Sequence, residues 1–166
     1  MTVVSVVPDE KALTLTLTAE YAAPVERVWQ LWADPRLLER WWGPPSYPAT
    51  FTEHSLETGG RMAYHMTSPD GERFPGWWRV VSVDAPKTIQ LEDGFGDADA
   101  PPPDMPIIRM SVDISDLGGG ETRMVLMSEF DSAEGMQKLI EMGMQEGLTQ
   151  AAGQIDALLG LEPATR

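Results

Sequence analysis

Apolar and polar side chains alternate along the chain between residues 13 and 21. Leu13, Leu15 and Leu17 are separated by threonines, and the alternation continues to Tyr21. A period of two places successive side chains on opposite faces of a β-strand. The pattern therefore predicts a half-buried strand over residues 13–21.

A helical period follows this strand. Val25, Val28, Trp29 and Trp32 recur at spacings of three and four residues, which is the spacing of one helix face. Pro24 suits the first helical position because its missing N–H would have no partner there. We expect a helix that carries both tryptophans on its buried stripe.

A second start signal, a capping side chain followed by proline, occurs at Asp34 and Pro35. It predicts another short helix, which the Gly-Pro-Pro of residues 43–45 ends. The apolar side chains of this helix are Leu37, Leu38, Trp41 and Trp42.

Short apolar runs separated by turn residues fill the middle of the chain. Turn residues gather at 58–60, 69–71, 85–87 and 118–120. The pattern predicts hairpins with strands at residues 47–55, 61–67, 74–83, 88–92, 107–114 and 122–129. With the first strand, about seven strands are expected. The acidic, proline-rich segment 93–104 is too polar for a core and predicts a protruding loop that could act as a lid.

The last periodic segment predicts one uninterrupted helix that begins after Asp131 and runs to Leu159. Glu134 lies three residues after Asp131, as in a capping box. At 1.5 Å per residue such a helix would be about 40 Å long. Gly143 and Gly147 within it each cost about 1 kcal/mol relative to alanine. We therefore expect them to permit a close approach of sheet, helix or ligand.

Acidic residues outnumber basic ones by 26 to 12, which gives a formal net charge of −14. This charge repels phosphate backbones and anionic lipids, so neither nucleic acid nor a membrane is an expected partner. The lack of cysteine excludes disulfides and thiol catalysis. No run approaches the roughly 20 apolar residues that span a bilayer, and the first residues carry no secretion signal. We expect one cytoplasmic domain over residues 1–166.

The two histidines, His54 and His65, lie on neighbouring predicted strands. A shared metal with Glu53 or Glu57 as third ligand is conceivable, but no His-Glu-x-x-His spacing supports it, and isolated side chains explain the pair better. His65 could instead act as a general base, because histidine titrates near neutral pH. There is no Gly-x-Ser-x-Gly elbow or phosphate loop. No catalytic residue, metal ligand or cofactor site is therefore assigned.

The chain carries ten methionines and six tryptophans, an excess of large, soft apolar groups. Methionine adapts to irregular core gaps and to varied hydrophobic ligands, so a loosely specified core or a ligand-facing wall would each explain the excess. Alternation places Met62, Tyr64 and Met66 on one sheet face. It also sends Trp77 and Trp78 to opposite faces without showing which is interior.

The order of strand, two short helices, six strands and long C-terminal helix resembles the helix-grip superfamily of START-related and birch-pollen-allergen-like proteins. Within it, the chain looks most like the bacterial branch related to the C-terminal domain of the activator of the heat-shock ATPase. The resemblance covers nearly the whole chain and rests on the segments APVERVWQLWADPRLLERWWGP (23–44), TGGRMAY (58–64), PDG (69–71), VVSVDAPKTIQL (80–91) and EGMQKLIEMGMQEGLTQAAGQIDALL (134–159).

The resemblance implies an α+β fold in which a strongly curved antiparallel sheet grips the long C-terminal helix. The short helix pair would close one end of the gap between them. Trp29 and Trp32 would then fill the core, whereas Trp41 and Trp42 would meet a ligand at the cavity mouth. The family has no fixed catalytic motif, so none is transferred.

The leading hypothesis is a cavity that binds a small hydrophobic or aromatic molecule without a cofactor. The candidate ligand contacts are Trp41, Trp42, Met62, Tyr64, Met66, Trp78, Met110, Met127, Met144 and Leu148. One alternative is an aromatase/cyclase-like enzyme in which His65 or Tyr64 moves protons. Another is an interaction module whose acidic surface docks a chaperone or other basic partner. A homodimer is compatible with each.

Overall fold

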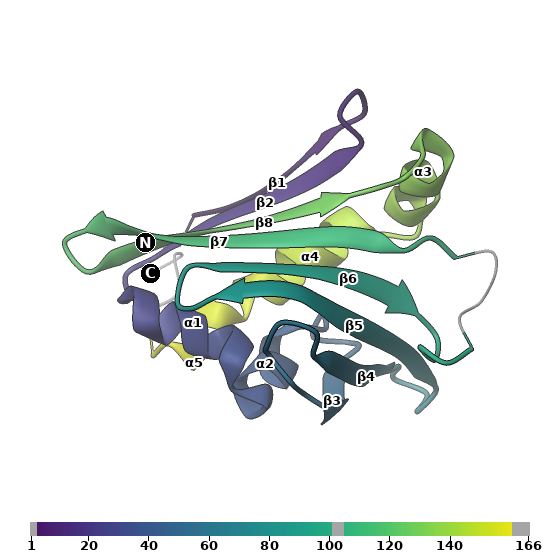
Figure 1. The fold of residues 1–166 in the computed structure, drawn as a ribbon, viewed down its shortest axis with the longest axis horizontal. Helices are drawn as coiled ribbons and strands as arrows, with labels where there is room; N and C mark the ends of the chain where they lie inside the picture. The colour runs from purple at the N-terminus through teal and green to yellow at the C-terminus, as the bar shows by residue number, and fades with distance from the viewer. Residues whose placement is uncertain (1–2, 101–104, 161–166) are drawn as a thin grey trace.

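Eight strands form one antiparallel sheet in the computed structural model, which describes residues 3–100 and 105–160 (Figure 1). The order along the sheet is β1-β2-β8-β7-β6-β5-β4-β3, so β1 and β3 form its edges. The strands are β1 (Val3–Asp9), β2 (Thr14–Tyr21), β3 (Ala49–Glu53), β4 (Arg61–Thr67), β5 (Arg73–Asp84), β6 (Thr88–Phe95), β7 (Ile108–Gly118) and β8 (Glu121–Glu129).

The sheet has one strand more than the approximate count of seven predicted, because the sequence pattern missed β1. This strand pairs with β2 along its length, with Val6 opposite Leu17. It lies at the edge of the sheet, includes Pro8, and exposes Val7, so it lacks the alternation that marks a half-buried strand. Every other predicted strand is confirmed to within a few residues at its ends.

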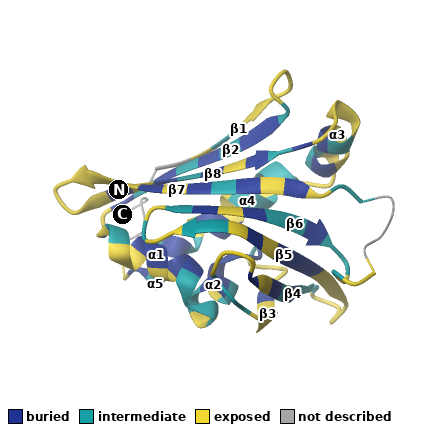
Figure 2. Ribbon diagram, in the orientation of Figure 1, coloured by how far each residue is buried: buried dark blue, intermediate teal, exposed yellow. Residues whose placement is uncertain are grey.

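The two faces of the sheet differ in burial. Along β7 and β8, buried residues alternate with more exposed ones (Figure 2). One face therefore packs against the helices and the other faces outward, as in antiparallel sheets that cover a core on one side. The buried apolar residues join into a cluster on the helix-facing side.

The predicted helix pair is confirmed as α1 (Val25–Ala33) and α2 (Pro35–Trp41). Asp34 caps α2, because its Oδ1 accepts a hydrogen bond from the Arg36 backbone N–H at 2.9 Å. Pro24 precedes α1 as its N-cap residue instead of opening it. The pair lies together at one end of the sheet (Figure 1).

The C-terminal segment is three helices, so the prediction of one uninterrupted helix is wrong. These are α3 (Ala133–Glu141), α4 (Met144–Gly153) and α5 (Ile155–Leu158). The first break falls at Gly143, whose φ of 95° is in the left-handed region that residues with a Cβ disfavour. The cap of α3 is Ser132, one residue later than expected, with Oγ accepting from the Gly135 N–H.

Helix α4 lies across the inner face of the sheet, whereas α3 lies beyond the end of β8 (Figure 1). Gln145 Nε2 donates to the Val6 carbonyl at 2.9 Å and holds α4 on β1. Gln154 Nε2 donates to the Gly43 carbonyl at 2.7 Å and holds the end of α4 near the helix pair. No helix in the described part of the chain is both long and apolar enough to cross a membrane.

Four tryptophans pack against one another where the helix pair meets the sheet. The ring centroids of Trp32 and Trp41 are 4.9 Å apart, and those of Trp42 and Trp78 are 4.8 Å apart, both edge to face. This arrangement is favourable for aromatic quadrupoles. Trp29 and Trp32 are buried in the core, as the sequence predicted.

Candidate ligand-binding site

A cavity of about 260 Å³ lies between the inner face of the sheet and the C-terminal helices. Its sheet wall comes from β4, β6, β7 and β8, and its other wall comes from α3, α4 and their junction. Apolar side chains dominate the lining, which consists of Trp42, Pro44, Tyr64, Met66, Asp93, Phe95, Ile108, Met110, Ser128, Leu139, Met142, Gly143, Met144, Gly147, Leu148 and Ala151.

One face of α4 forms part of the helical wall. Met144, Gly147, Leu148 and Ala151 recur at the spacing of a single helix face. A side chain added at Gly147 would meet no atom within 4 Å. The missing side chain therefore leaves open space between α4 and the sheet.

Tyr64 on β4 reaches across β5 to Asp93 on β6. Its hydroxyl donates a hydrogen bond to Asp93 Oδ1 at 3.0 Å. Gly76 on the intervening strand permits this reach, because a Cβ at that position would lie 2.5 Å from Tyr64 Cζ. The bare backbone at Gly76 thus lets the phenol ring lie over β5 and places a polar pair in an otherwise apolar wall.

Burial raises the pKa of Asp93 to about 7, against smaller opposing effects from Tyr64 and Trp78. Trp78 Nε1 makes no hydrogen bond among the described residues, so the geometry supports the bond from Tyr64 as the contact of this carboxyl. Burial, followed by the charge of Asp93, raises the pKa of Tyr64 well above its ordinary value. The cavity therefore holds a carboxyl that titrates near neutral pH beside a phenol that stays protonated.

Two further polar groups line the cavity without a hydrogen-bond partner. Trp42 Nε1 and Ser128 Oγ are buried and unpaired among the described residues. Trp42 is 6% exposed and Ser128 is 1% exposed, so water does not freely replace the missing partners. An unsatisfied buried polar group costs about 1–3 kcal/mol. A bound molecule could supply the partners that the protein does not.

The structure brings most of the predicted ligand contacts together. The predicted residues that line the cavity are Trp42, Tyr64, Met66, Met110, Met144 and Leu148. Trp41, Met62 and Trp78 are instead packed into the core and do not line it. Trp41 and Trp78 pack edge to face against Trp42, which does line the cavity.

Trp77 and Trp78 point to opposite faces of the sheet, as alternation predicts. Trp78 belongs to the buried core cluster. Trp77 lies over Gly94 of the neighbouring strand, where a Cβ would be 2.1 Å from Trp77 Cε2. The sequence could not choose between the two because both residues are equally apolar.

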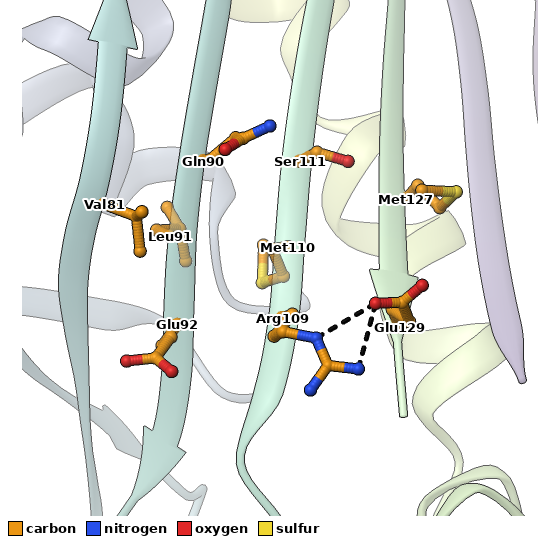
Figure 3. A pocket seen from close by; sticks show the side chains of 9 residues that line it. All are labelled: Val81, Gln90, Leu91, Glu92, Arg109, Met110, Ser111, Met127 and Glu129. Carbon is orange, nitrogen blue, oxygen red and sulfur yellow. Dashed lines mark hydrogen bonds and ion pairs between the residues drawn. The ribbon is translucent and has the colours of Figure 1, made fainter. Parts of the chain in front are cut away.

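A groove of about 420 Å³ lies on the outer face of the sheet and is shown in Figure 3. Met127, which is 36% exposed, lies in this groove with Val81, so the prediction that Met127 lines the cavity is wrong. The cation of the groove, Arg109, donates to Glu129 from Nε at 3.0 Å and to Asp131 from Nη1 at 2.5 Å. Because the protein's own carboxylates already engage this cation, the groove is the weaker candidate site.

Asp93 was not expected in a site, because the sequence placed it in the protruding loop of residues 93–104. In the structure β6 continues to Phe95, so the first three residues of that segment belong to the sheet. Residues 101–104 of the predicted loop lie outside the described residues.

The sequence carries a signal for Asp93 and Ser128, the two polar lining residues that were not predicted. Ile89 and Leu91 alternate inward, and the same period continues to Asp93. On β8, Leu126 faces inward and the period continues to Ser128. Extending each alternation past the last apolar residue would have found both side chains.

The histidines do not form a site. His54 Nε2 lies 2.9 Å from the Trp32 carbonyl oxygen, which can only accept, so this nitrogen carries a proton. His65 alternates with Tyr64 along β4 and is not part of the cavity wall. Among the residues that the structure describes, no three His, Asp or Glu side chains converge to hold a metal. The hypothesis of His65 as a base inside the cavity therefore has no support.

Residues 22–160 match the family model described as activator of Hsp90 ATPase homolog 1-like protein. Protein Ms6760 from Mycobacterium smegmatis is 46% identical over 95% of this chain and 97% of its own, with a TM-score of 0.86. A protein from Arthrobacter aurescens is 47% identical over 96% of this chain and 92% of its own, with a TM-score of 0.89.

A more distant solved structure shares the fold alone. The AHSA1 protein from Silicibacter pomeroyi is 20% identical over 89% of this chain and 97% of its own, with a TM-score of 0.71. No curated protein matches the sequence.

Proposed function

Because the chain belongs to the activator of Hsp90 ATPase homolog 1-like family, with its helix-grip-like fold, we propose that its cavity binds a small hydrophobic molecule with a ring system. The observation that carries this proposal is an apolar-walled cavity of about 260 Å³ that Gly143 and Gly147 leave unfilled. The family match also confirms the resemblance that the sequence motifs indicated.

The volume of the cavity limits the size of its ligand. A dry apolar cavity of about 150 Å³ is enough to bind benzene, whereas pockets for drug-sized molecules begin at about 300 Å³. A volume of about 260 Å³ lies between these limits. It fits a molecule of one or two rings better than a long lipid or a polycyclic product.

The wall chemistry favours an aromatic ligand. Trp42, Tyr64 and Phe95 line the cavity from three separate segments, and aromatic rings form favourable edge-to-face contacts with one another. Met110 and Met144 add flexible, polarisable walls that adapt to ligand shape.

A cavity-filling substitution tests this function. Gly147→Leu places a large side chain on the cavity face of α4 without an initial clash, since no atom lies within 4 Å of the added Cβ. Leucine is also a better helix former than glycine. Gly153→Leu is the matched control, because Gly153 is an exposed α4 glycine with equally open surroundings and does not line the cavity.

We expect naphthalene to bind the wild-type protein saturably in a tryptophan-fluorescence titration, because Trp42 lines the cavity. Gly147→Leu should weaken this binding at least tenfold, and Gly153→Leu should leave it unchanged. Circular dichroism checks that both variants are folded. Absence of saturable binding to the wild type, or equal binding by a folded Gly147→Leu variant, would contradict the proposed function.

A further inference from the structure

We propose that the ligand of this cavity is a hydroxylated aromatic molecule, whose hydroxyl group donates to Asp93 and accepts from the indole N–H of Trp42. The proposal rests on the proposed function of the cavity and adds the chemical class of its ligand. It follows from the hydrogen-bonding capacity that the folded chain leaves unused.

Asp93 supplies the acceptor. Its Oδ1 already accepts from the Tyr64 hydroxyl at 3.0 Å. A carboxylate has about four lone-pair positions, so one bond from Tyr64 leaves acceptor capacity free in the cavity wall. A donor on the ligand would complete the environment of this carboxyl.

Trp42 supplies the hydrogen-bond donor. An indole nitrogen donates but does not accept. Trp42 lines the cavity, its Nε1 is buried without a hydrogen-bond partner among the described residues, and its ring lies edge to face with Tyr64 at a centroid distance of 6.5 Å. The unused donor therefore lies beside the Tyr64–Asp93 pair, within the same polar part of the wall.

A hydroxyl group fits this pair of protein groups because it donates and accepts at one atom. A hydrocarbon leaves Trp42 Nε1 unpaired and adds no bond to Asp93, and an ether can accept but cannot donate. An ammonium group can donate to Asp93 but cannot accept from Trp42. A carboxylate would approach Asp93 with like charge, and no Lys, Arg or His among the described residues lines the cavity to neutralise it.

Burial of Asp93 supports a neutral partner over a charged one. Its raised pKa of about 7 reflects a carboxyl that burial has made costly to ionise. A second buried charge would add its own desolvation penalty, which attraction between the two charges repays only in favourable geometry. A hydroxyl forms the hydrogen bond without that penalty.

A matched series of bicyclic probes tests the proposal: 2-naphthol, 2-methoxynaphthalene, naphthalene, 2-(aminomethyl)naphthalene and 2-naphthoate, each titrated at pH 7 by fluorescence or calorimetry. We expect 2-naphthol to bind at least tenfold more tightly than each of the other four. Trp42→Phe and Asp93→Asn should each remove most of that advantage. The advantage is measured within each variant, as the ratio of its 2-naphthol affinity to its own naphthalene affinity by calorimetry, and circular dichroism checks that both variants are folded.

Asp113→Asn is the control for Asp93→Asn, since Asp113 is exposed on β7 and does not line the cavity. It should keep the full preference for 2-naphthol. If naphthalene binds as tightly as 2-naphthol, the hydroxyl proposal is overturned while the hydrophobic cavity stands. Tightest binding of the ammonium probe would overturn it in favour of a cationic ligand. If none of the five probes binds, the proposed function fails as well.

Discussion

Asp93 couples the protonation of one side chain to the stability of the fold. Its pKa of about 7 lies above the ordinary value of 3.8, so between these values the folded state binds the proton more tightly than the unfolded state. Stability from this group is fully present below about pH 4 and is lost as the pH rises through about 7. The shift corresponds to at most about 4 kcal/mol.

The Asp93→Asn variant should remove this pH dependence, because asparagine resembles the protonated carboxyl. Relative to the variant, the wild type should lose unfolding free energy between pH 4 and pH 7 and then level off. Urea denaturation of both proteins at several pH values measures the difference. Asp113→Asn should show no such trend against the wild type, and a constant difference for Asp93→Asn would contradict the assigned shift.

The junction of α3 and α4 shows how a single glycine shapes an element. Gly143 adopts a φ of 95°, which turns the chain between two helices that both line the cavity. A residue with a Cβ disfavours this conformation by about 1–2 kcal/mol. The break at Gly143 thus lets α3 and α4 lie at different places along the sheet.

Gly143→Ala should therefore destabilise the protein by about 1–2 kcal/mol. Gly153→Ala in the same segment should instead stabilise it by up to about 1 kcal/mol, since Gly153 has ordinary helical backbone and open space around the added Cβ. Urea denaturation of the two variants gives the comparison. A Gly143→Ala variant at least as stable as the wild type would show that the left-handed turn is not required.

Much of the element order is readable from periodicity. The strand β4 and the helix pair follow directly from patterns of two and of three to four residues, because each buries one face. The helix break at Gly143 could not be read, since the apolar spacing continues through it. β1 was missed because an edge strand with an exposed face needs no strict alternation, and its identity depends on pairing with β2.

The candidate site was harder to predict than the fold, for a physical reason. Apolar lining residues such as Met66 and Met110 share their pattern with core residues such as Met62, and only the packing of α4 separates the two groups. Asp93 looked like part of a loop because a charged residue usually marks the end of a strand. Its role depends on Gly76, which lets a tyrosine two strands away reach it.

Across the whole molecule, the two faces of the sheet differ in exposure and in what they contact. The outer face carries exposed residues and ion pairs such as Arg109 with Glu129, in a chain of net charge −14. The inner face packs against the helices and forms the sheet wall of the cavity. The net negative charge repels anions, whereas an uncharged apolar ligand is not subject to that repulsion.

Methionines lie on both faces of the sheet, so their methyl groups can distinguish ligand binding in the cavity from binding in the outer groove. Met66 and Met144 line the cavity, Met110 borders both the cavity and the outer groove, and Met127 lies in the outer groove. Protein carrying ¹³C-labelled methionine methyl groups can be titrated with 2-naphthol and followed by NMR. We predict that the Met66 and Met144 resonances shift together and saturate while Met127 stays unchanged. Shifts at Met127 with unchanged cavity methionines would contradict it.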